Sequence, residues 1–369
     1  MITNNDMNKI CLIYNYAQHY RSNIFKLMDK ELACDFVFGD KCGDIKKMNY
    51  DLLDNSVTEV TNIQCKGLVY QKEVPSLIFK PYDKYIALGQ PSDISTWGLL
   101  LLSKLTSKKV YLWTHGWYGR ETFAKKIIKK LFFGLADGLL IYGDYAIDLM
   151  VKEGFKRDKL FAIHNSLDYD TQKSIRRELK PSSIFNDHFN NSSYNLIFIG
   201  RLTKVKKLDF ILDVLKISDT KYNLTYIGTG EDEARLKNLV KEYNLDNRVW
   251  FYGACYDEKK LAELIFNADL CIAPGNVGLT SIHCLSYGCP VVTHNNYPMQ
   301  MPEFEVIKSG VTGDFFEYKN VDSLCEVVEK WFSQVKDREA IRMAAYNIID
   351  ESWNPYYQIK TIKKMLNSK

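Results

Sequence analysis

Two cationic side chains follow an apolar, strand-like run near the middle of the chain. In IGRLTKVKK, Gly200 ends the run, and Arg201 and Lys206 precede the next helical pattern. A guanidinium and an ammonium at this spacing can both reach a diphosphate, because the glycine allows the backbone to approach the ligand closely. The pattern therefore predicts a diphosphate site, and a basic loop in solvent is the alternative.

A second anion site is predicted in APGNVGLTSIHCLSYGCPVVT, residues 273–293. An apolar strand runs into a glycine-containing turn, a helix is expected to begin near Leu279, and Gly288 is expected to end it. The first N–H groups of that helix, on Gly278, Leu279 and Thr280, have a partial positive charge that favours a phosphate. An ordinary turn of an α/β protein is the alternative.

Polar side chains also follow strand-like runs in the first half of the chain. His115 and Arg120 lie in HGWYGR, and His19, Tyr20 and Arg21 lie in NYAQHYR at the start of a predicted helix. An imidazole so placed can hydrogen-bond a sugar or a phosphate, and the NYAQHYR group predicts contacts with a polar acceptor. The alternatives are a structural histidine at the end of a strand and an arginine exposed in the first helical turn.

Alternating strand-like and helix-like segments must position these side chains. The alternation starts at residue 9, is interrupted by a polar stretch rich in Ser and Asn, and then resumes. This rhythm predicts an α/β protein with two doubly wound parallel sheets, in which ligands bind beyond the carboxyl ends of the strands. We expect a domain over 1–170, a linker with at most one short helix over 171–194, a second domain over 195–352, and a helix over about 353–369 that returns to the first domain.

Length and composition limit the class of protein. A chain of 369 residues suits two α/β domains, and a net charge of +4 neither requires nor excludes an acidic partner such as nucleic acid. The chain start lacks the basic segment of a secretory signal, and the apolar run Leu131–Tyr142 is too short to span a membrane. Nine cysteines without a C-x-x-C pair predict a reducing compartment and no zinc site. We therefore expect a cytoplasmic protein, either soluble or peripheral on the inner face of the membrane.

The helix predicted after His115 is basic on one face. Its apolar residues cover half of the helical wheel, its lysines cover the other half, and Phe133 falls among the lysines. Such a helix is typical of a membrane-surface anchor, and a core-packed helix with a solvated basic face is the alternative. The apolar residues are Phe123, Ile127, Ile128, Leu131, Phe132 and Leu135, and the lysines are Lys125, Lys126, Lys129 and Lys130.

Taken together, these motifs resemble those of family 4 glycosyltransferases of the GT-B fold. The similarity is strongest from Ile199 to Gly313, in GRLTKVKKLDFIL, IGTGEDEARL, VWFYGACYDEKKLAEL, ADLCIAP, GLTSIHCLSYGCPVV and EVIKSGVTG, and the first half adds HGWYGR and IHNSLD. The resemblance implies two Rossmann-like domains facing a central cleft and a UDP- or GDP-linked sugar as donor. It also implies no metal, no further cofactor, and transfer with retention of anomeric configuration.

The resemblance also implies roles for individual residues. Arg201 and Lys206 would hold the diphosphate, and His115 would lie over the donor sugar and the acceptor. The remaining residues implied to bind the donor are Gly200, Gly253, Cys255, Tyr256, Gly278, Leu279 and Thr280.

Two positions depart from the family pattern. The family usually has two glutamates eight positions apart in the glycine-containing turn and the helix that follows it. This chain has Gly275 and His283 at those positions. An imidazole can still hold ribose hydroxyls, whereas a glycine offers no side chain to the donor sugar, so Asn276 is the candidate substitute.

The resulting hypothesis is a hexosyl- or N-acetylhexosaminyltransferase. It would act on a glycan or lipid-linked acceptor in surface polysaccharide biosynthesis, with no nucleic acid as partner. A sugar-nucleotide epimerase of the same fold, or a nucleotide-binding protein that has lost catalysis, are the alternatives.

Overall fold

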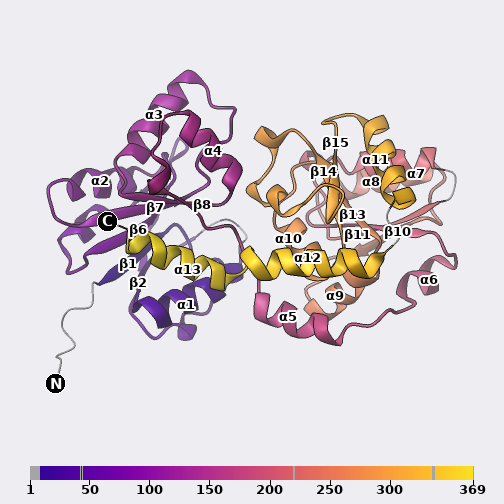
Figure 1. Ribbon diagram of the computed structural model, residues 1–369, viewed down its shortest axis with the longest axis horizontal. Helices are drawn as coiled ribbons and strands as arrows, with labels where there is room; N and C mark the ends of the chain where they lie inside the picture. Colours follow the sequence, from indigo (N-terminus) through magenta and orange to yellow (C-terminus); the bar gives the residue numbers. More distant parts are fainter. Residues whose placement is uncertain (1–8, 42, 44, 219–220, 335–336, 369) are drawn as a thin grey trace. The chain divides into compact units, whose positions relative to one another are not determined.

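The computed structural model describes residues 9–368 except 42, 44, 219–220 and 335–336, and it divides into two compact units (Figure 1). The first unit reaches to Leu167 and includes the segment from Asn354 onward, and the second unit is Asp168–Trp353.

The first unit contains a seven-stranded parallel sheet in the order β3-β2-β1-β6-β7-β8-β9. Successive residues of β1 point to opposite faces, so each face of the sheet has its own buried apolar layer. Helices α1 and α13 cover one face, and α2, α3 and α4 cover the other (Figure 1). The strands are β1 (Ile10–Tyr14), β2 (Asp35–Gly39), β3 (Val57–Val60), β6 (Lys84–Leu88), β7 (Lys109–Thr114), β8 (Gly138–Ile141) and β9 (Leu160–Ala162), and the helices are α1 (Ser22–Leu32), α2 (Ile94–Ser103), α3 (Phe123–Gly134), α4 (Asp144–Lys152) and α13 (Pro355–Leu366).

The second unit contains a six-stranded parallel sheet in the order β12-β11-β10-β13-β14-β15. Its strands are β10 (Tyr194–Ile199), β11 (Tyr222–Ile227), β12 (Val249–Gly253), β13 (Leu270–Ala273), β14 (Val291–His294) and β15 (Gly313–Phe316). Its helices are α5 (Tyr169–Glu178), α6 (Ile184–Phe189), α7 (Asp209–Ile217), α8 (Glu233–Glu242), α9 (Glu258–Asn267), α10 (Leu279–Ser286), α11 (Val321–Gln334) and α12 (Arg338–Ser352). The prediction of an α/β protein with two parallel sheets is confirmed.

The segment predicted to be a linker is instead ordered and belongs to the second unit. Residues 171–194 contain most of α5 and all of α6. Arg176 of α5 forms an ion pair with Asp350, and Phe185 of α6 is buried. The prediction failed because a few anchoring side chains fix these helices while most of their surface stays polar.

The last helix belongs to the first unit, as predicted. Asn354 caps α13 by accepting a hydrogen bond from the N–H of Tyr357, and Pro355 occupies the first turn. Ile359, Ile362 and Met365 are buried in the layer beside α1.

Helix α3 buries a different face from the one predicted. Phe132 and Phe133 lie in the core, so the prediction that Phe133 lies among the lysines on the outer face is wrong. Lys126 and Lys130 pair with Glu153, and Lys129 pairs with Glu121. The exposed ridge of the helix is apolar, with exposed fractions between 45% and 81% for Phe123, Ile127, Ile128 and Leu131.

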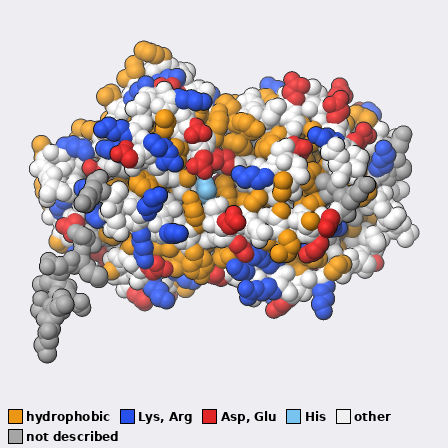
Figure 2. Space-filling model, in the orientation of Figure 1, with side chains coloured by type: hydrophobic (Ala, Val, Ile, Leu, Met, Phe, Trp, Pro, Cys, Tyr) orange, Lys and Arg blue, Asp and Glu red, His pale blue; other side chains and the backbone are white. Residues whose placement is uncertain are grey.

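Hydrophobic and basic side chains lie together at the upper end of the first unit in Figure 2, where Figure 1 draws α3. Among the helices that the structure describes, none is both long enough and apolar enough to cross a bilayer.

Candidate functional site

The predicted diphosphate site of the second unit is built where two neighbouring strands end. Strands β10 and β13 pair in parallel, so the loop after Gly200 and the turn after Ala273 emerge at the same edge of the sheet. The N–H of Gly275 donates to the carbonyl oxygen of Lys206 at 2.9 Å. A Cβ atom at position 275 would lie 2.3 Å from the carbonyl oxygen of Val205 and 2.6 Å from Cα of Lys206. Glycine at this position is therefore required by the contact between the two loops.

The ammonium group of Lys206 lies inside the turn that precedes α10. Its Nζ donates to the carbonyl oxygen of Asn276 at 2.7 Å and to the Oδ1 of the same residue at 3.1 Å. Burial lowers the pKa of Lys206, the Glu303 carboxylate opposes this shift, and Arg201 adds to it. Arg201 itself is exposed. The structure thus places one cation inside the turn and a second, solvated one at the end of β10.

Helix α10 begins at Leu279, as predicted, and no side chain caps its N-terminus. Thr280 Oγ1 donates to the carbonyl oxygen of Ile199 at 2.9 Å, which fixes the helix start against the end of β10. Ser281 Oγ donates to the carbonyl oxygen of Glu303 at 2.9 Å. The helix start is thereby held in place while its first N–H groups have no capping side chain, which is the arrangement that favours an anion.

His283, at the position where the resemblance implies a glutamate, contacts a carboxylate from another helix. Its Nε2 lies 2.9 Å from Oε1 of Glu258, and the same oxygen accepts from Tyr287 at 2.6 Å and from Gln172 at 3.1 Å. Burial raises the pKa of Glu258, but the hydrogen bonds and charge of His283 outweigh it and the net shift is downward. In the neutral tautomer that donates from Nε2 to this carboxylate, Nδ1 of His283 is an acceptor, which suits a hydroxyl ligand.

Glu258 and Tyr287 were missed from the sequence. Glu258 lies on α9, at a distance of 25 positions from His283, so no local spacing links them. Glu303 was also missed, although it is 3% exposed and electrostatically coupled to Lys206. The sequence signal that could have identified Glu303 is an acidic residue between two apolar ones, Pro302 and Phe304.

The loop with the implied donor-binding residues Gly253, Cys255 and Tyr256 lies at the end of β12, which is an edge strand of the sheet. Gly253 has a φ of 85°, and Tyr256 is 96% exposed. Cys255 is half-buried. Strand β11 separates this loop from β10 and the Lys206 turn.

A cavity of about 460 Å³ lies in the first unit, at the carboxyl ends of four adjacent strands. Residues that end or follow β1, β6, β7 and β8 line it, among them Tyr14, Gln90, His115 and Tyr142. The His115 ring lies 4.7 Å from that of Tyr142. Burial, with smaller contributions from Arg21 and Lys129, lowers the pKa of His115 to about 4. His115 is therefore neutral near pH 7 and can act there as a hydrogen-bonding group.

The structure brings together some of the predicted acceptor-side residues. Tyr20 and Arg21 line the cavity with His115. Arg21 is buried, so the alternative of a solvated charge in the first helical turn is wrong. His19 is exposed, does not line the cavity, and has Nδ1 3.2 Å from the carbonyl oxygen of Lys46. Arg120 lines an adjoining cavity of about 450 Å³ with Lys125 and Ile128.

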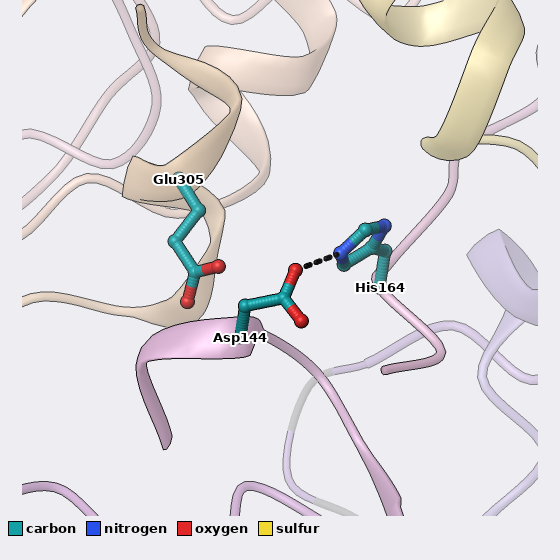
Figure 3. Close-up of side chains that lie close together, drawn as sticks. All are labelled: Asp144, His164 and Glu305. Carbon is teal, nitrogen blue, oxygen red and sulfur yellow. Dashed lines mark ion pairs between the residues drawn. The ribbon is translucent and has the colours of Figure 1, made fainter. Parts of the chain in front are cut away.

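A histidine–carboxylate pair lies after β9 in the first unit. Figure 3 shows the Asp144 carboxylate directed at the imidazole of His164, with 3.6 Å between Oδ2 and Nε2. The His164 ring stacks on Tyr357 of α13. The stacking holds the IHNSLD segment against the last helix, and the ion pair joins the same segment to the start of α4.

Comparison with known proteins gives the family context. Residues 180–348 match the family model described as glycosyl transferases group 1. An uncharacterized 41.2 kDa protein in the cps region of Klebsiella pneumoniae is 26% identical over 284 residues, which are 75% of this chain and 71% of that protein. Poly(glycerol-phosphate) alpha-glucosyltransferase of Bacillus subtilis strain 168 is 23% identical over 311 residues, which are 81% of this chain and 42% of that protein.

A solved structure matches both units. Alr3699/HepE of Anabaena, in complex with UDP, has a TM-score of 0.73 at 14% identity, and the match covers 98% of this chain and 100% of that one. At this identity the likeness concerns the fold. Residues 180–348, slightly less than half of the chain, are thus similar to group 1 glycosyl transferases, and the chain has the GT-B fold.

Proposed function

We propose that this protein is a glycosyltransferase that moves one sugar from a nucleoside-diphosphate donor to a glycan or lipid-linked acceptor. The observation that supports this most is the half-buried Lys206 ammonium, which is held by Asn276 in the turn that opens helix α10. A half-buried cation beside helix-start N–H groups that no described side chain caps is suited to a diphosphate. Surface polysaccharide biosynthesis is the proposed context, in line with the names of the relatives.

The proposed chemistry follows from the charges. Cleavage of the sugar–phosphate bond leaves a nucleoside diphosphate on which negative charge grows. Arg201, Lys206 and the first N–H groups of α10 would stabilise that charge without a metal or a further cofactor. The neutral His115 would hydrogen-bond the sugar, and His283, oriented by Glu258, would accept from the ribose. We further propose retention of configuration and a UDP- or GDP-linked hexose or N-acetylhexosamine.

We also propose a peripheral association with the inner face of the membrane through α3. The four apolar side chains on its exposed ridge support this, because such a ridge is unfavourable in water and favourable at a lipid surface.

The proposed function is tested by binding and turnover of UDP-, GDP- and dTDP-sugars. Lys206→Ala is expected to reduce turnover about 10²- to 10³-fold, as does the loss of other preorganised charge-stabilising groups. Lys204→Ala is the matched control, because Lys204 lies in the same turn and is exposed. Equal turnover in the Lys206 and Lys204 variants would contradict the site assignment.

The same experiment separates the alternative functions. Conversion of the donor in the absence of any acceptor would indicate an epimerase. Binding of a nucleotide sugar without hydrolysis or transfer for any donor and acceptor would indicate a binding protein.

A further inference from the structure

We infer that the cavity of the first unit binds an acidic acceptor, namely a sugar or polyol with a carboxylate or phosphate group, and that Arg21 holds that group. This inference rests on the proposed function, since it names the class of acceptor.

Arg21 is a buried cation with one hydrogen bond among the described residues and two unsatisfied nitrogens. Its side chain is 8% exposed and lines the cavity. Nη2 donates to the hydroxyl of Tyr142 at 2.6 Å, whereas Nε and Nη1 are buried and have no hydrogen-bond partner among the described residues. Buried charged groups are normally paired, because an unpaired one loses its hydration without compensation. An oxyanion in the cavity would supply the missing partner.

Aromatic rings surround the guanidinium without satisfying its N–H groups. Its Cζ lies between 5.3 and 5.7 Å from the ring centroids of Tyr14, Tyr20, Trp113 and Tyr142. Such contacts stabilise a cation, but a ring face accepts no strong in-plane hydrogen bond. The same rings provide flat apolar walls against which a sugar can pack.

The charge of the cavity favours an anion over a neutral glycan. Of the described residues that line it, two are cationic, Arg21 and Lys129, and none is Asp or Glu. Lys129 is neutralised by Glu121, which lies 2.6 Å away and is not part of the lining. The charge of Arg21 is therefore left without a counter-charge in the cavity, and a neutral acceptor would leave it so.

The remaining polar groups suit the hydroxyls of a sugar. Asn15, Gln18 and Gln90 also line the cavity. Oε1 of Gln18 and Nδ1 of His115 are buried and have no hydrogen-bond partner in the part of the chain that the structure describes. A volume of about 460 Å³ accommodates a ligand of small-molecule size, such as one or two sugar residues.

The test is a titration of the whole protein with glucuronate, glucose 6-phosphate and neutral glucose, followed by calorimetry or ligand-detected NMR. We expect at least one acidic probe to bind wild type, and to bind Arg21→Met about 30-fold or more weakly. Glucose should not distinguish the two proteins. Lys26→Met is the matched control, because Lys26 is an exposed cation on α1 in the same unit.

Further variants keep the test decisive. If Arg21→Met does not fold, Arg21→Lys decides, since it keeps the charge but loses the planar pair of donors and should weaken binding about tenfold. The carboxylate and phosphate probes distinguish the two sources of the oxyanion, and binding of both supports the shared chemistry. Equal binding of the acidic probes to wild type and the Arg21 variants, or no binding of either probe to wild type, would overturn the inference.

Failure of the inference and failure of the proposed function remain distinguishable. Lys206→Ala should lose UDP binding but keep the Arg21-dependent binding of the acidic probe. Arg21→Met should lose binding of the acidic probe but keep UDP binding. Absence of UDP binding to wild type would reject the donor site. The comparison of acidic-probe binding between wild type and the Arg21 variants would still test the inference.

Discussion

The N–H of Gly275 donates to the carbonyl oxygen of Lys206 at 2.9 Å, and this contact leaves no space for a side chain on the glycine. Position 275, where the family resemblance implies a glutamate, instead sets the path of the loop that presents Lys206.

Replacement of Gly275 by alanine tests this relationship. The added Cβ would overlap the backbone of Val205 and Lys206, so we expect a loss of about 1–3 kcal/mol in the free energy of unfolding and at least tenfold weaker UDP binding. Denaturant unfolding and calorimetry measure the two effects. Gly134→Ala is the control, because a Cβ there meets no atom within 4 Å and alanine favours a helix. Wild-type UDP affinity in Gly275→Ala would show that the loop contact is dispensable.

The imidazole–carboxylate pair of His283 and Glu258 gives a second prediction. Glu258→Gln should remove the group that orients His283, and we expect an increase of about tenfold in the KM for the donor with little change in kcat. The effect should shrink for a donor built on 2′-deoxyribose if the ribose hydroxyl is the ligand. Glu263→Gln on the same helix is the control, because Glu263 pairs with Lys260 at the surface. An equal increase in KM for the ribose and the 2′-deoxyribose donor would show that His283 does not bind the ribose 2′-hydroxyl.

The depressed pKa of His115 predicts a pH dependence of stability. Burial lowers this pKa from 6.5 to about 4, so the folded state binds the proton less readily than the unfolded chain. The stability linked to His115 is therefore complete above pH 6.5 and is lost as the pH falls toward 4. Between pH 8 and pH 5, wild type should lose about 2 kcal/mol more of its unfolding free energy than His115→Gln.

Chemical denaturation at the two pH values measures this difference. The exposed His19→Gln should behave like wild type, and buried His294 should contribute in the same direction in all three proteins. Parallel pH profiles for wild type and His115→Gln would contradict the shift.

Membrane association is predicted to depend on the apolar ridge of α3. Phe123→Gln with Leu131→Gln should reduce flotation with vesicles that contain anionic lipid at least several-fold, because two exposed apolar side chains are lost. Leu101→Gln with Leu105→Gln is the control, since both are exposed apolar residues at the end of α2. These changes leave the ion pairs of Lys126, Lys129 and Lys130 intact. Equal flotation of all three proteins would reject the association.

Local signals in the sequence were sufficient for the elements and for one part of the site. The start of α10 follows from a strand, a glycine turn and a helical pattern within a few residues, and the structure begins the helix at Leu279. Periodicity likewise predicted the parallel sheets, because each strand is a short apolar run.

The surroundings of single side chains could not be predicted in this way. Arg21 is buried because Tyr14, Trp113 and Tyr142 come from strands far apart in the sequence that meet at one sheet edge. His283 finds its carboxylate on another helix, and α3 turns its Phe133 inward because the core, not the helical wheel, decides which face is buried. The missed contacts are all long-range.

The second unit is continuous in sequence, whereas the first is interrupted by it, since α13 completes the layer beside α1. During synthesis, the strands of the first sheet therefore leave the ribosome with one face covered by α1 but not yet by α13. The later-made unit has every strand and helix it needs before that face is closed. Domains usually fold as units in the order of synthesis, but here the last helix to be made completes the first unit.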